Sequence, residues 1–544
     1  MNLPTPAIVA ERGAERLPRL ALILLCAAYV LPGIFGRNPW RNADLTAFGF
    51  MASIAEGRAP WWQPAIAGIP AEGGPLPYWL GALAIKALPF LDEPVAARLP
   101  YALVLVGVLV AVWYTCFHLA RTEAAQPVAF AFGGEAQAVD YARALADGAL
   151  LALMASLGLL RLGHETTPEL LQLLAISVYI YGLAAAPFRP GRARWAVLLA
   201  LPVLAASGAP TVACILGLLG VVLNRRSSYQ EAKALGLWLI GALVLAGLAA
   251  WTFEGWAWRV KPGIEIGQLL SLLAWFCWPS GPLALWTLWR WRRHGLRRHI
   301  TVPVSALLVP LIACIAMEGS DRALLLALPS LAILAAFALP TLSRGFSAAV
   351  DWFSVFFFSA TGLFAWLYYV SMHTGWPKTP LANMRRLAAG FEPHFGLRAF
   401  VLALVASAAW LALVRWRTAR HRHALWKSLA LPAGGVALGW LLAMTLLLPP
   451  LDYARSLAPL VAQIKAYIPA DAQCLAAPDQ GLPVLAALEW HGGWHVQGSG
   501  SLAASSCPYA ILAAGRPTPA GWHVLAEMQK PTDRSPSLLL LRRQ

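Results

Sequence analysis

Long apolar runs recur along the first 450 residues and are separated by short polar segments. A helix that crosses a bilayer needs about 20 mostly apolar residues. Thirteen runs reach or approach that length, near residues 19–35, 98–120, 147–163, 168–187, 195–207, 210–223, 234–253, 268–289, 300–318, 323–341, 349–371, 398–415 and 426–448. The pattern predicts an all-α polytopic membrane domain over residues 1–449.

The pattern changes after residue 449. Short apolar runs alternate with turn residues in IPADAQCLAAPDQGLPVLAAL, in SSCPYAILAA and in the final LLLLRRQ. Runs of this length between turn residues are typical of strands. We expect a small α/β domain over residues 450–544.

Residues 121–146 are ambiguous. Their apolar run, PVAFAF, is too short to span a membrane, and a crossing would bury Glu135 and Asp140. We expect a cytoplasmic loop here. If the segment crosses instead, Asp147 moves to the outer face and becomes a candidate site residue.

The composition agrees with a membrane protein. Of the 544 residues, 59% are hydrophobic and 12% are charged, against about 25% charged in soluble proteins. The net charge of +16 reflects Arg in short loops, which sets topology, so we expect no nucleic-acid partner. The first apolar run, LALILLCAAYVLPGIF, follows several Arg and lacks a small-residue cleavage site, so it predicts an uncleaved signal anchor.

The positions of the basic residues predict the orientation, because cytoplasmic loops are enriched in Lys and Arg. With the N-terminus in the cytoplasm and thirteen spans, the tail lies outside, in the periplasm of an inner membrane. The inner loops then hold the clusters Arg189/Arg192/Arg194, Arg225/Arg226/Lys233, Arg290/Arg292/Arg293/Arg297/Arg298 and Arg417/Arg420/Arg422/Lys427.

The first external loop, residues 36–97, is long and dense in Trp, Pro and Gly, as in WWQPAIAGIPAEGGPLPYWL. Such a loop is unlike a plain connector. We expect it to lie on the outer membrane surface as short amphipathic helices and to cover an active site.

Two of the seven cysteines, Cys474 and Cys507, lie in the external tail, and the other five lie in predicted spans. An oxidising compartment allows the two external cysteines to pair. We therefore expect a disulfide between them.

The first loop and the next span resemble the bacterial branch of the protein O-mannosyltransferase superfamily, which are GT-C glycosyltransferases and include the lipid A aminoarabinose transferase. The match consists of an acid after the first span, a Pro-x-x-x-Gly-x-Pro stretch, a Glu–Pro–Leu–Tyr-Trp-Leu stretch and an Ala-Arg-Leu-Pro start. Its residues here are Asp44; Pro64, Gly68 and Pro70; Glu72, Pro75, Leu76, Tyr78, Trp79 and Leu80; and Ala97, Arg98, Leu99 and Pro100. PLDYARSLAPLVAQIKAYIPADA also resembles the family's segment before its external domain.

The sequence departs from the family at three positions. Leu45 replaces the second acid, Gly73 replaces the Lys of Glu-Lys-Pro-Pro, and Ser207-Gly208-Ala209-Pro210 stands where the family has Thr-Lys-Gly-Pro. If the two lysines hold the donor phosphate, other bases must do so here, or the substrate differs, or activity is lost.

The resemblance implies transfer of a sugar from undecaprenyl (polyprenyl) phosphate to lipid A, another envelope glycan or a protein, with inversion. Such a reaction needs a carboxylate as base, positive charge for the leaving phosphate and a groove for the lipid tail. Asp44 is the first candidate for the base and Glu165 the second. A solvated loop acid or a helix N-cap is the alternative for Asp44.

Other polar residues of the predicted outer loops are candidate ligands. Tyr78 and Glu72 could bind substrate, although Glu72 also fits an exposed turn. Glu72 and His164 could hold a divalent metal ion, whereas GHETTPEL also reads as a plain helix start. The candidate phosphate contacts, each of which also fits an interfacial base, are Arg259, Lys261, Arg322, Lys378, Arg385 and Arg386.

The sequence therefore predicts a GT-C glycosyltransferase that acts as a monomer. A flippase for a lipid-linked sugar is one alternative, but the chain shows no internal repeat and its charged residues gather at the outer face, which favours the enzyme. A degenerate relative that binds polyprenyl lipid without turnover is the other. An Asp44 that faces a cavity would count against that relative, and an Asp44 in bulk water would support it.

Overall fold

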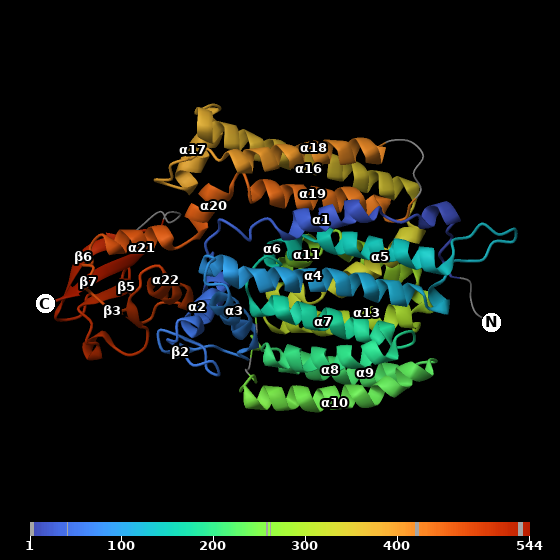
Figure 1. Cartoon of the computed structure of the whole chain (residues 1–544), viewed down its shortest axis with the longest axis horizontal. Helices are drawn as coiled ribbons and strands as arrows, with labels where there is room; N and C mark the ends of the chain where they lie inside the picture. Colours follow the sequence, from blue (N-terminus) through green and yellow to red (C-terminus); the bar gives the residue numbers. More distant parts are fainter. Residues whose placement is uncertain (1–4, 41, 257–258, 262, 419–423, 531–536) are drawn as a thin grey trace.

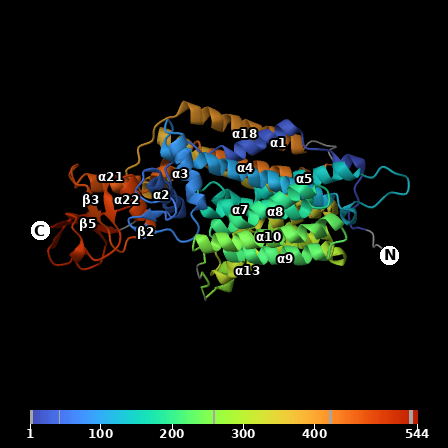
Figure 2. The same ribbon diagram turned by 60° about the horizontal axis from the view of Figure 1, so that its bottom comes forward.

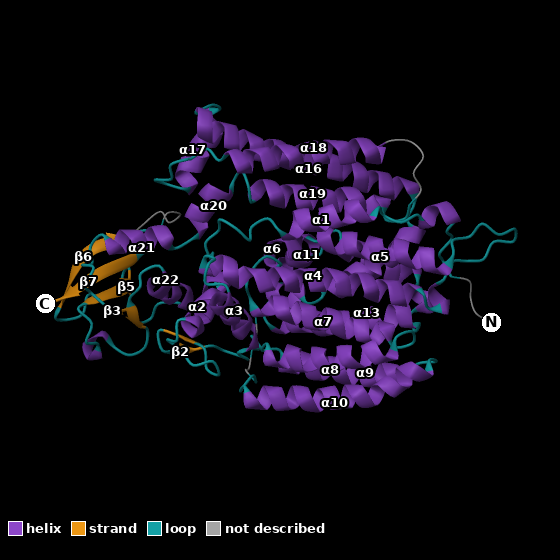
Figure 3. Cartoon of the chain, in the orientation of Figure 1, coloured by secondary structure: helices purple, strands orange, loops and turns teal. Residues whose placement is uncertain are grey.

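The computed structural model of the chain places a helix bundle beside a small sheet. It describes residues 5–40, 42–256, 259–261, 263–418, 424–530 and 537–544. Strands are confined to one end of the molecule, apart from the bundle (Figure 3). Two views place the N-terminal residues at the opposite end (Figures 1 and 2). We call these the domain end and the N-terminal end.

The bundle is built from helices, and the long ones run between these two ends (Figure 1). Each predicted span coincides with at least one of them. They are α1 (Arg19–Val30), α4 (Glu93–Ala120), α5 (Ala138–Ala155), α6 (Leu157–Leu162), α7 (Pro168–Ala185), α8 (Pro190–Ala206), α9 (Pro210–Arg225), α10 (Gln230–Thr252), α11 (Ile266–Phe276), α12 (Ser280–Arg290), α13 (Arg298–Ala316), α14 (Asp321–Leu325), α15 (Leu328–Ala338), α16 (Arg344–Thr374), α18 (Leu397–Thr418) and α19 (Lys427–Ala443).

The chain is a multi-pass membrane protein. Within the described residues, six helices are long and apolar enough to cross a membrane, or up to eight if each bent helix pair counts as one span. One bend, of 93°, separates α11 from α12, and the other, of 73°, separates α19 from α20 (Leu448–Arg455). The number thirteen stays a prediction, because several of the matching helices are short.

Burial divides the bundle into inner and outer helices. Every residue of α15 is buried, as is most of α5. By contrast, α10, α16 and α18 expose large apolar side chains such as Trp251, Leu363 and Val405. Lipid tails are as apolar as these side chains, so a membrane helix can leave them exposed without cost.

Residues 121–137 contain no α-helix, as expected for a loop, and the structure corrects the prediction only for residues 138–146. Helix α5 begins at Ala138, within the expected loop. Asp140 forms an ion pair with Arg16 at 3.0 Å, and the Asp147 carboxylate accepts a hydrogen bond from the Leu17 backbone N–H at 3.1 Å. The segment therefore stays at the N-terminal end. Asp147 lies far from the first loop and is not a candidate for a site there.

The first loop is folded, but it is not a set of surface helices. It contains α2 (Ala43–Ala55), β1 (Ala65–Ile66), β2 (Ile69–Pro70) and α3 (Leu76–Ala87). Helix α2 is almost wholly buried, because α3 covers one side and α22 (Leu482–Trp490) of the C-terminal domain covers another. Small residues allow this approach: a Cβ on Gly49 would lie 2.6 Å from the Ala486 Cβ. The amphipathic surface helix that we expected is wrong for α2.

The C-terminal domain follows α20 and α21 (Ala458–Lys465) and carries a five-stranded mixed sheet in the order β4-β3-β5-β7-β6. Strand β3 is parallel to β4 and β5, whereas β7 is antiparallel to β5 and β6. The strands are β3 (Cys474–Ala476), β4 (His495–Gln497), β5 (Tyr509–Ala513), β6 (Trp522–Met528) and β7 (Leu538–Arg543). The run PVLAAL, expected as a strand, is part of α22, since a short apolar run does not distinguish a strand from a buried helix.

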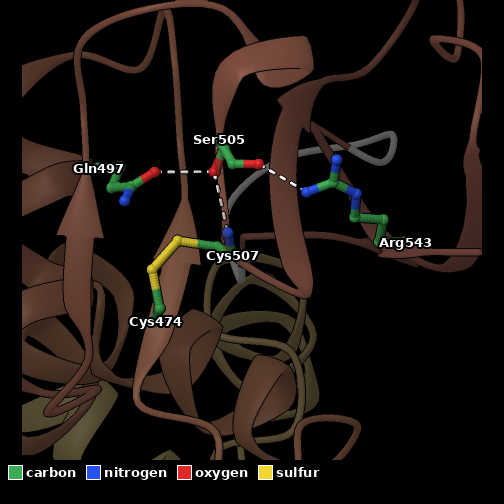
Figure 4. The surroundings of a disulfide bond; sticks show 5 residues. All are labelled: Cys474, Gln497, Ser505, Cys507 and Arg543. Carbon is green, nitrogen blue, oxygen red and sulfur yellow. Dashed lines mark hydrogen bonds between the residues drawn. A yellow bond between two sulfur atoms is a disulfide. The ribbon is translucent and has the colours of Figure 1, made fainter.

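Cys474 and Cys507 form a disulfide between β3 and the residues that precede β5 (Figure 4). Their Cα atoms are 5.2 Å apart. Ser505 fixes the chain beside the bond: its hydroxyl accepts the Cys507 N–H at 3.2 Å and donates to Gln497, and its carbonyl accepts from Arg543 at 2.7 Å. The bond thus joins β3 to the segment that leads into its parallel neighbour β5.

Candidate functional site

A cavity of about 540 Å³ with charged side chains on its wall lies at the domain end, between the first loop, the bundle and the C-terminal domain. We call it the domain-end cavity. Its walls come from α2, α3, α7, α8 and α22 and from the loops beside them. The lining residues are Asn42, Ala43, Thr46, Ala47, Glu72, Gly74, Tyr78, Pro168, Glu169, Gln172, Ser207, Arg259, Leu482 and Pro483.

A glycine contact places one wall of this cavity. A Cβ on Gly74 would lie 1.8 Å from the carbonyl oxygen of Ala206, so only glycine lets the loop before α3 rest on the end of α8. Gly73 has a φ of 101°, which also favours glycine. This contact sets Glu72 and Tyr78 on the cavity wall.

Arg259 is the basic residue of the cavity wall. Its Nη2 atom lies 3.3 Å from the Cβ position of Gly73 and 3.8 Å from that of Gly208. These are the two loops in which the resemblance led us to expect lysines. The Arg259 guanidinium therefore supplies positive charge between Gly73 and Gly208, which carry no charged side chain themselves.

Two carboxylates share one guanidinium beside the cavity. Arg322 contacts Glu165 at 2.7 Å and Glu169 at 3.3 Å, and it also donates to the Thr167 hydroxyl at 3.3 Å. Glu169, in the first turn of α7, lines the cavity, whereas Glu165 does not. Burial raises the pKa of Glu165 to about 7, and Asp44 and Glu169 add to this rise against the opposing charge of Arg322. The charge of Arg322 therefore offsets only part of the effect of burial on the pKa of Glu165.

Asp44 does not face the domain-end cavity. Its neighbours Ala43, Thr46 and Ala47 line the cavity, but its own carboxylate lies on the other side of α2. One oxygen accepts the Thr166 N–H and hydroxyl, both at 2.9 Å, and the other accepts the Trp40 N–H at 3.2 Å.

The electrostatics of Asp44 explain how a fully buried acid remains charged. Arg37 lies 3.6 Å from its carboxylate, and both side chains are almost completely buried. Burial by itself would raise the pKa of Asp44, but the charges of Arg37 and Arg98 and the two Thr166 hydrogen bonds outweigh it and lower the pKa. Asp44 therefore lies neither in the cavity nor in bulk water, and neither outcome foreseen from the sequence applies.

His164 and Glu72 do not lie together. The His164 Nε2 atom is 2.8 Å from the Tyr29 carbonyl oxygen, and its ring packs against Trp440 with centroids 4.3 Å apart. Burial lowers the pKa of His164 to about 4, so the ring is neutral. It lines a separate small cavity of about 20 Å³ beside Arg98. Among the described residues, no group of three or more His, Cys, Asp or Glu side chains is arranged to hold a metal ion, so the predicted pair does not fit one.

Four of the predicted phosphate contacts lie elsewhere. Lys261 is exposed and uses its backbone N–H to bond the Ala316 carbonyl at 3.0 Å. Lys378, Arg385 and Arg386 are exposed on α17 (Lys378–Leu387), which packs against α16 at the upper edge of Figure 1. The sequence could not separate these bases from Arg259, because loop composition does not say which way a loop folds.

Sequence reasoning missed Asp452, which fixes the loop before α2. Its carboxylate accepts the Asn38 N–H at 2.8 Å, the Asn38 amide at 2.7 Å and the Trp40 indole N–H at 3.0 Å. The Trp40 ring lies between two guanidinium groups, with Arg37 at 4.7 Å and Arg455 at 4.9 Å. The only signal was that Asp452 belongs to the PLDYARSLAPL stretch that carries part of the resemblance.

The C-terminal domain is fixed to the first loop. Glu489 of α22 pairs with Arg58 and accepts the Ala67 N–H at 3.0 Å. The indole of Trp490 donates to Glu93 at 2.9 Å and packs edge-on against Phe48. These contacts hold the wall that α22 gives to the cavity, so the cavity is complete only when the two domains are joined.

Comparison with solved structures identifies the fold. The structure of ArnT from Cupriavidus metallidurans in the apo state has a TM-score of 0.61, with 15% sequence identity over 96% of each chain. The same protein bound to undecaprenyl phosphate has a TM-score of 0.60, with 13% identity over 96% of each chain. No family model and no curated relative matches the sequence. The chain has the GT-C fold of ArnT, as the sequence resemblance implied.

Proposed function

We propose that this chain is a GT-C glycosyltransferase that moves a sugar from a polyprenyl phosphate to a hydroxyl of an envelope acceptor, for which lipid A is one candidate. The observation that carries the proposal is the domain-end cavity, in which Arg259 shares a wall with two carboxylates, Glu72 and Glu169. The structural likeness to ArnT bound to undecaprenyl phosphate supports the choice of donor.

The reaction is a single displacement. The acceptor oxygen forms a bond to the anomeric carbon while the bond from that carbon to the phosphate oxygen breaks, so the configuration inverts. The polyprenyl phosphate leaves with the bonding electron pair, and a carboxylate takes the acceptor proton. Arg259 stabilises the charge that grows on the leaving phosphate, because a guanidinium forms strong charge-assisted hydrogen bonds to phosphate oxygens.

Glu169 is the proposed base. It lines the cavity, whereas the Asp44 carboxylate is buried and accepts three hydrogen bonds from Thr166 and Trp40. A base must lie within hydrogen-bond reach of the proton that it takes. Glu165 and Arg322 act as positioning residues, because Arg322 contacts both glutamates and holds Glu169 at the rim.

Asp44 is proposed as a positioning residue too. Its bonds to Thr166 join α2 to the loop that carries Glu165 and leads into Glu169. Its pairing with Arg37 joins the first turn of α2 to the segment that precedes the helix. The family-based expectation that Asp44 matters for transfer is thereby kept, with a different physical reason.

The proposed orientation puts the domain end in the periplasm and the N-terminal end in the cytoplasm. Arg189, Arg192, Arg225 and Arg226 all lie where helices turn at the N-terminal end. Basic residues collect on the cytoplasmic side of membrane proteins. Donor and acceptor would then meet on the periplasmic face.

The test measures transfer of labelled sugar from membranes that contain the wild type or a variant to lipid, glycan and protein fractions. Glu169→Gln and Arg259→Gln should each lower transfer by about 100-fold or more, with normal insertion and Tm. Glu527→Gln is the matched control, because Glu527 is exposed on β6 and should leave transfer unchanged.

Each result distinguishes between the proposed enzyme and its alternatives. Wild-type transfer by Glu169→Gln would refute the base, and wild-type transfer by Arg259→Gln would refute the phosphate contact. If the wild type binds polyprenyl phosphate but labels no fraction, the enzyme is refuted and a lipid-binding relative or a flippase remains. The fraction that carries the label identifies the acceptor.

A further inference from the structure

A second large groove lies on the lipid-facing side of the bundle, between α4, α7 and α8. Its volume is about 700 Å³, and its lining is almost wholly apolar apart from one guanidinium and the hydroxyls of two tyrosines. Leu199 and Val110 stay 60% and 49% exposed, which shows that the groove opens to the membrane. Its walls include Val110, Tyr114, Val178, Tyr181, Arg192 and Leu199.

A basic cluster lies at the end of this groove that is nearest the N-terminal end. Arg121 follows α4 directly and lies over the ring of Phe188, with 4.7 Å between its Cζ atom and the ring centroid. Arg189 follows Phe188 in the chain, and Arg192 lines the groove itself. Among the residues that the structure describes, no carboxylate forms an ion pair with Arg121, Arg189 or Arg192. Within the described part of the chain, no ion pair therefore balances the positive charge of the cluster.

His118 adds an unused polar atom at the same place. Its side chain is buried, and its Nδ1 atom has no hydrogen-bond partner within the described part of the chain. The ring stacks on Phe188 at 5.7 Å and approaches Tyr181, which lines the groove, at 5.9 Å. A buried polar atom without a partner is costly, so an acceptor or donor from outside the chain would satisfy it.

We propose that this groove is a binding site for an anionic diacyl phospholipid of the leaflet that faces the N-terminal end. An acyl chain lies in the apolar groove, and the phosphate lies among Arg121, Arg189 and Arg192. Charge complementarity selects this occupant, because basic pockets between membrane helices bind acidic head groups. A zwitterionic lipid would leave the cluster with no net counter-charge.

This site is separate from the domain-end cavity. Helix α8 begins beside Arg192 and ends at Ala206, next to the cavity wall, so the two sites lie at opposite ends of one helix. A polyprenyl phosphate bound for catalysis would have its phosphate at the cavity and not here. The proposal therefore holds whether or not the chain transfers sugar.

The experiment is native mass spectrometry of the full-length protein in detergent, titrated with dioleoyl phosphatidylglycerol or dioleoyl phosphatidylcholine. The wild type should bind the first lipid more tightly. Each basic residue near a phosphate contributes about fivefold to the affinity, so Arg121→Gln/Arg192→Gln should weaken phosphatidylglycerol binding by about 25-fold. Phosphatidylcholine binding should weaken by less, because its choline cation offsets the charge of its phosphate. Arg225→Gln/Arg226→Gln is the matched control, since these exposed residues lie at the same end but not in the groove.

A second variant tests the groove itself. Leu199→Trp fills it from the exposed side and should weaken both lipids, because it competes with the acyl chain. Arg192→Gln alone, at an exposed position, should weaken phosphatidylglycerol about fivefold without a change in Tm. Equal wild-type affinity for the two lipids would overturn the proposal. So would equal losses in the groove pair and the control pair.

Discussion

Replacing Asp44 by Asn should destabilise the protein before it affects the chemistry. The substitution keeps the shape of the side chain and removes its charge. Arg37 would then remain buried without its partner, since its side chain is only 2% exposed and that of Asp44 only 3%. Breaking a buried ion pair from one side costs about 3–5 kcal/mol.

The expected size of the effect is measurable by thermal unfolding. The entropy of unfolding of a chain of 544 residues is about 1.1 kcal/mol/K. A loss of 3–5 kcal/mol therefore lowers Tm by about 3–4 °C. The folded-state pKa of Asp44 is lowered, so its stabilisation is complete above the unfolded pKa of about 3.9 and is lost only as the pH falls through the lower folded value. The Tm difference should be smaller at pH 8 than at pH 6, because Asp44 repels the ionised Glu165 carboxylate and the variant removes that repulsion.

A double variant isolates the pair. Arg37→Gln should also destabilise the protein, but Arg37→Gln/Asp44→Asn should cost at least about 1 kcal/mol less than the two single changes together, because neither charge is then left alone. Differential scanning fluorimetry of the detergent-purified protein measures all three. Additive losses would refute the ion-pair argument. An unchanged Tm with abolished sugar transfer would restore Asp44 as the base.

Three further outcomes are expected. The pKa of Glu165 is raised to about 7, so the folded state holds an extra proton between about pH 4.5 and 7, and this residue makes the stability fall as the pH rises through that window. Glu165→Gln should therefore flatten the dependence of Tm on pH. An unchanged slope would contradict the raised pKa. Gly74→Ala should lower both Tm and transfer, since its Cβ would meet backbone at 1.8 Å, whereas Gly247→Ala, which has open space around it, should change neither by much. Reducing the Cys474–Cys507 bond, which closes a loop with a sequence separation of 33, should destabilise the C-terminal domain by about 4 kcal/mol and speed its cleavage in limited proteolysis; equal cleavage rates would show that the bond adds no stability.

The membrane class and the positions of the bundle helices followed from the sequence. A helix that crosses a bilayer must be long and apolar, and both properties can be read from the sequence of each segment by itself. The strands at Cys474, at Tyr509 and at Leu538 were also predictable, because short apolar runs between turn residues favour strands. Local sequence patterns were sufficient to predict an element wherever its structure depends on its own length and composition.

Local patterns failed where a segment's surroundings are other parts of the chain. Helix α2 was expected at a membrane surface and is instead buried under α22. The C-terminal domain packs against the apolar side chains of α2, and the sequence of α2 does not show that it will. Asp140 was taken as evidence for a loop, but its pairing with Arg16 lets α5 begin earlier. Both errors come from partners that are distant in sequence.

The site shows the same division. The sequence identified the outer loops that carry acids and bases, and it included Glu72, Tyr78 and Arg259 among the candidates. It did not include Glu169, whose side chain lines the cavity, and it did not show that Asp44 lies outside the cavity, because both facts depend on how the segments pack. It could not show that Arg259 lies between Gly73 and Gly208, since that contact joins three segments far apart in the chain. Composition and periodicity are properties of single segments, whereas a site is a set of distances between segments, which only the tertiary structure fixes.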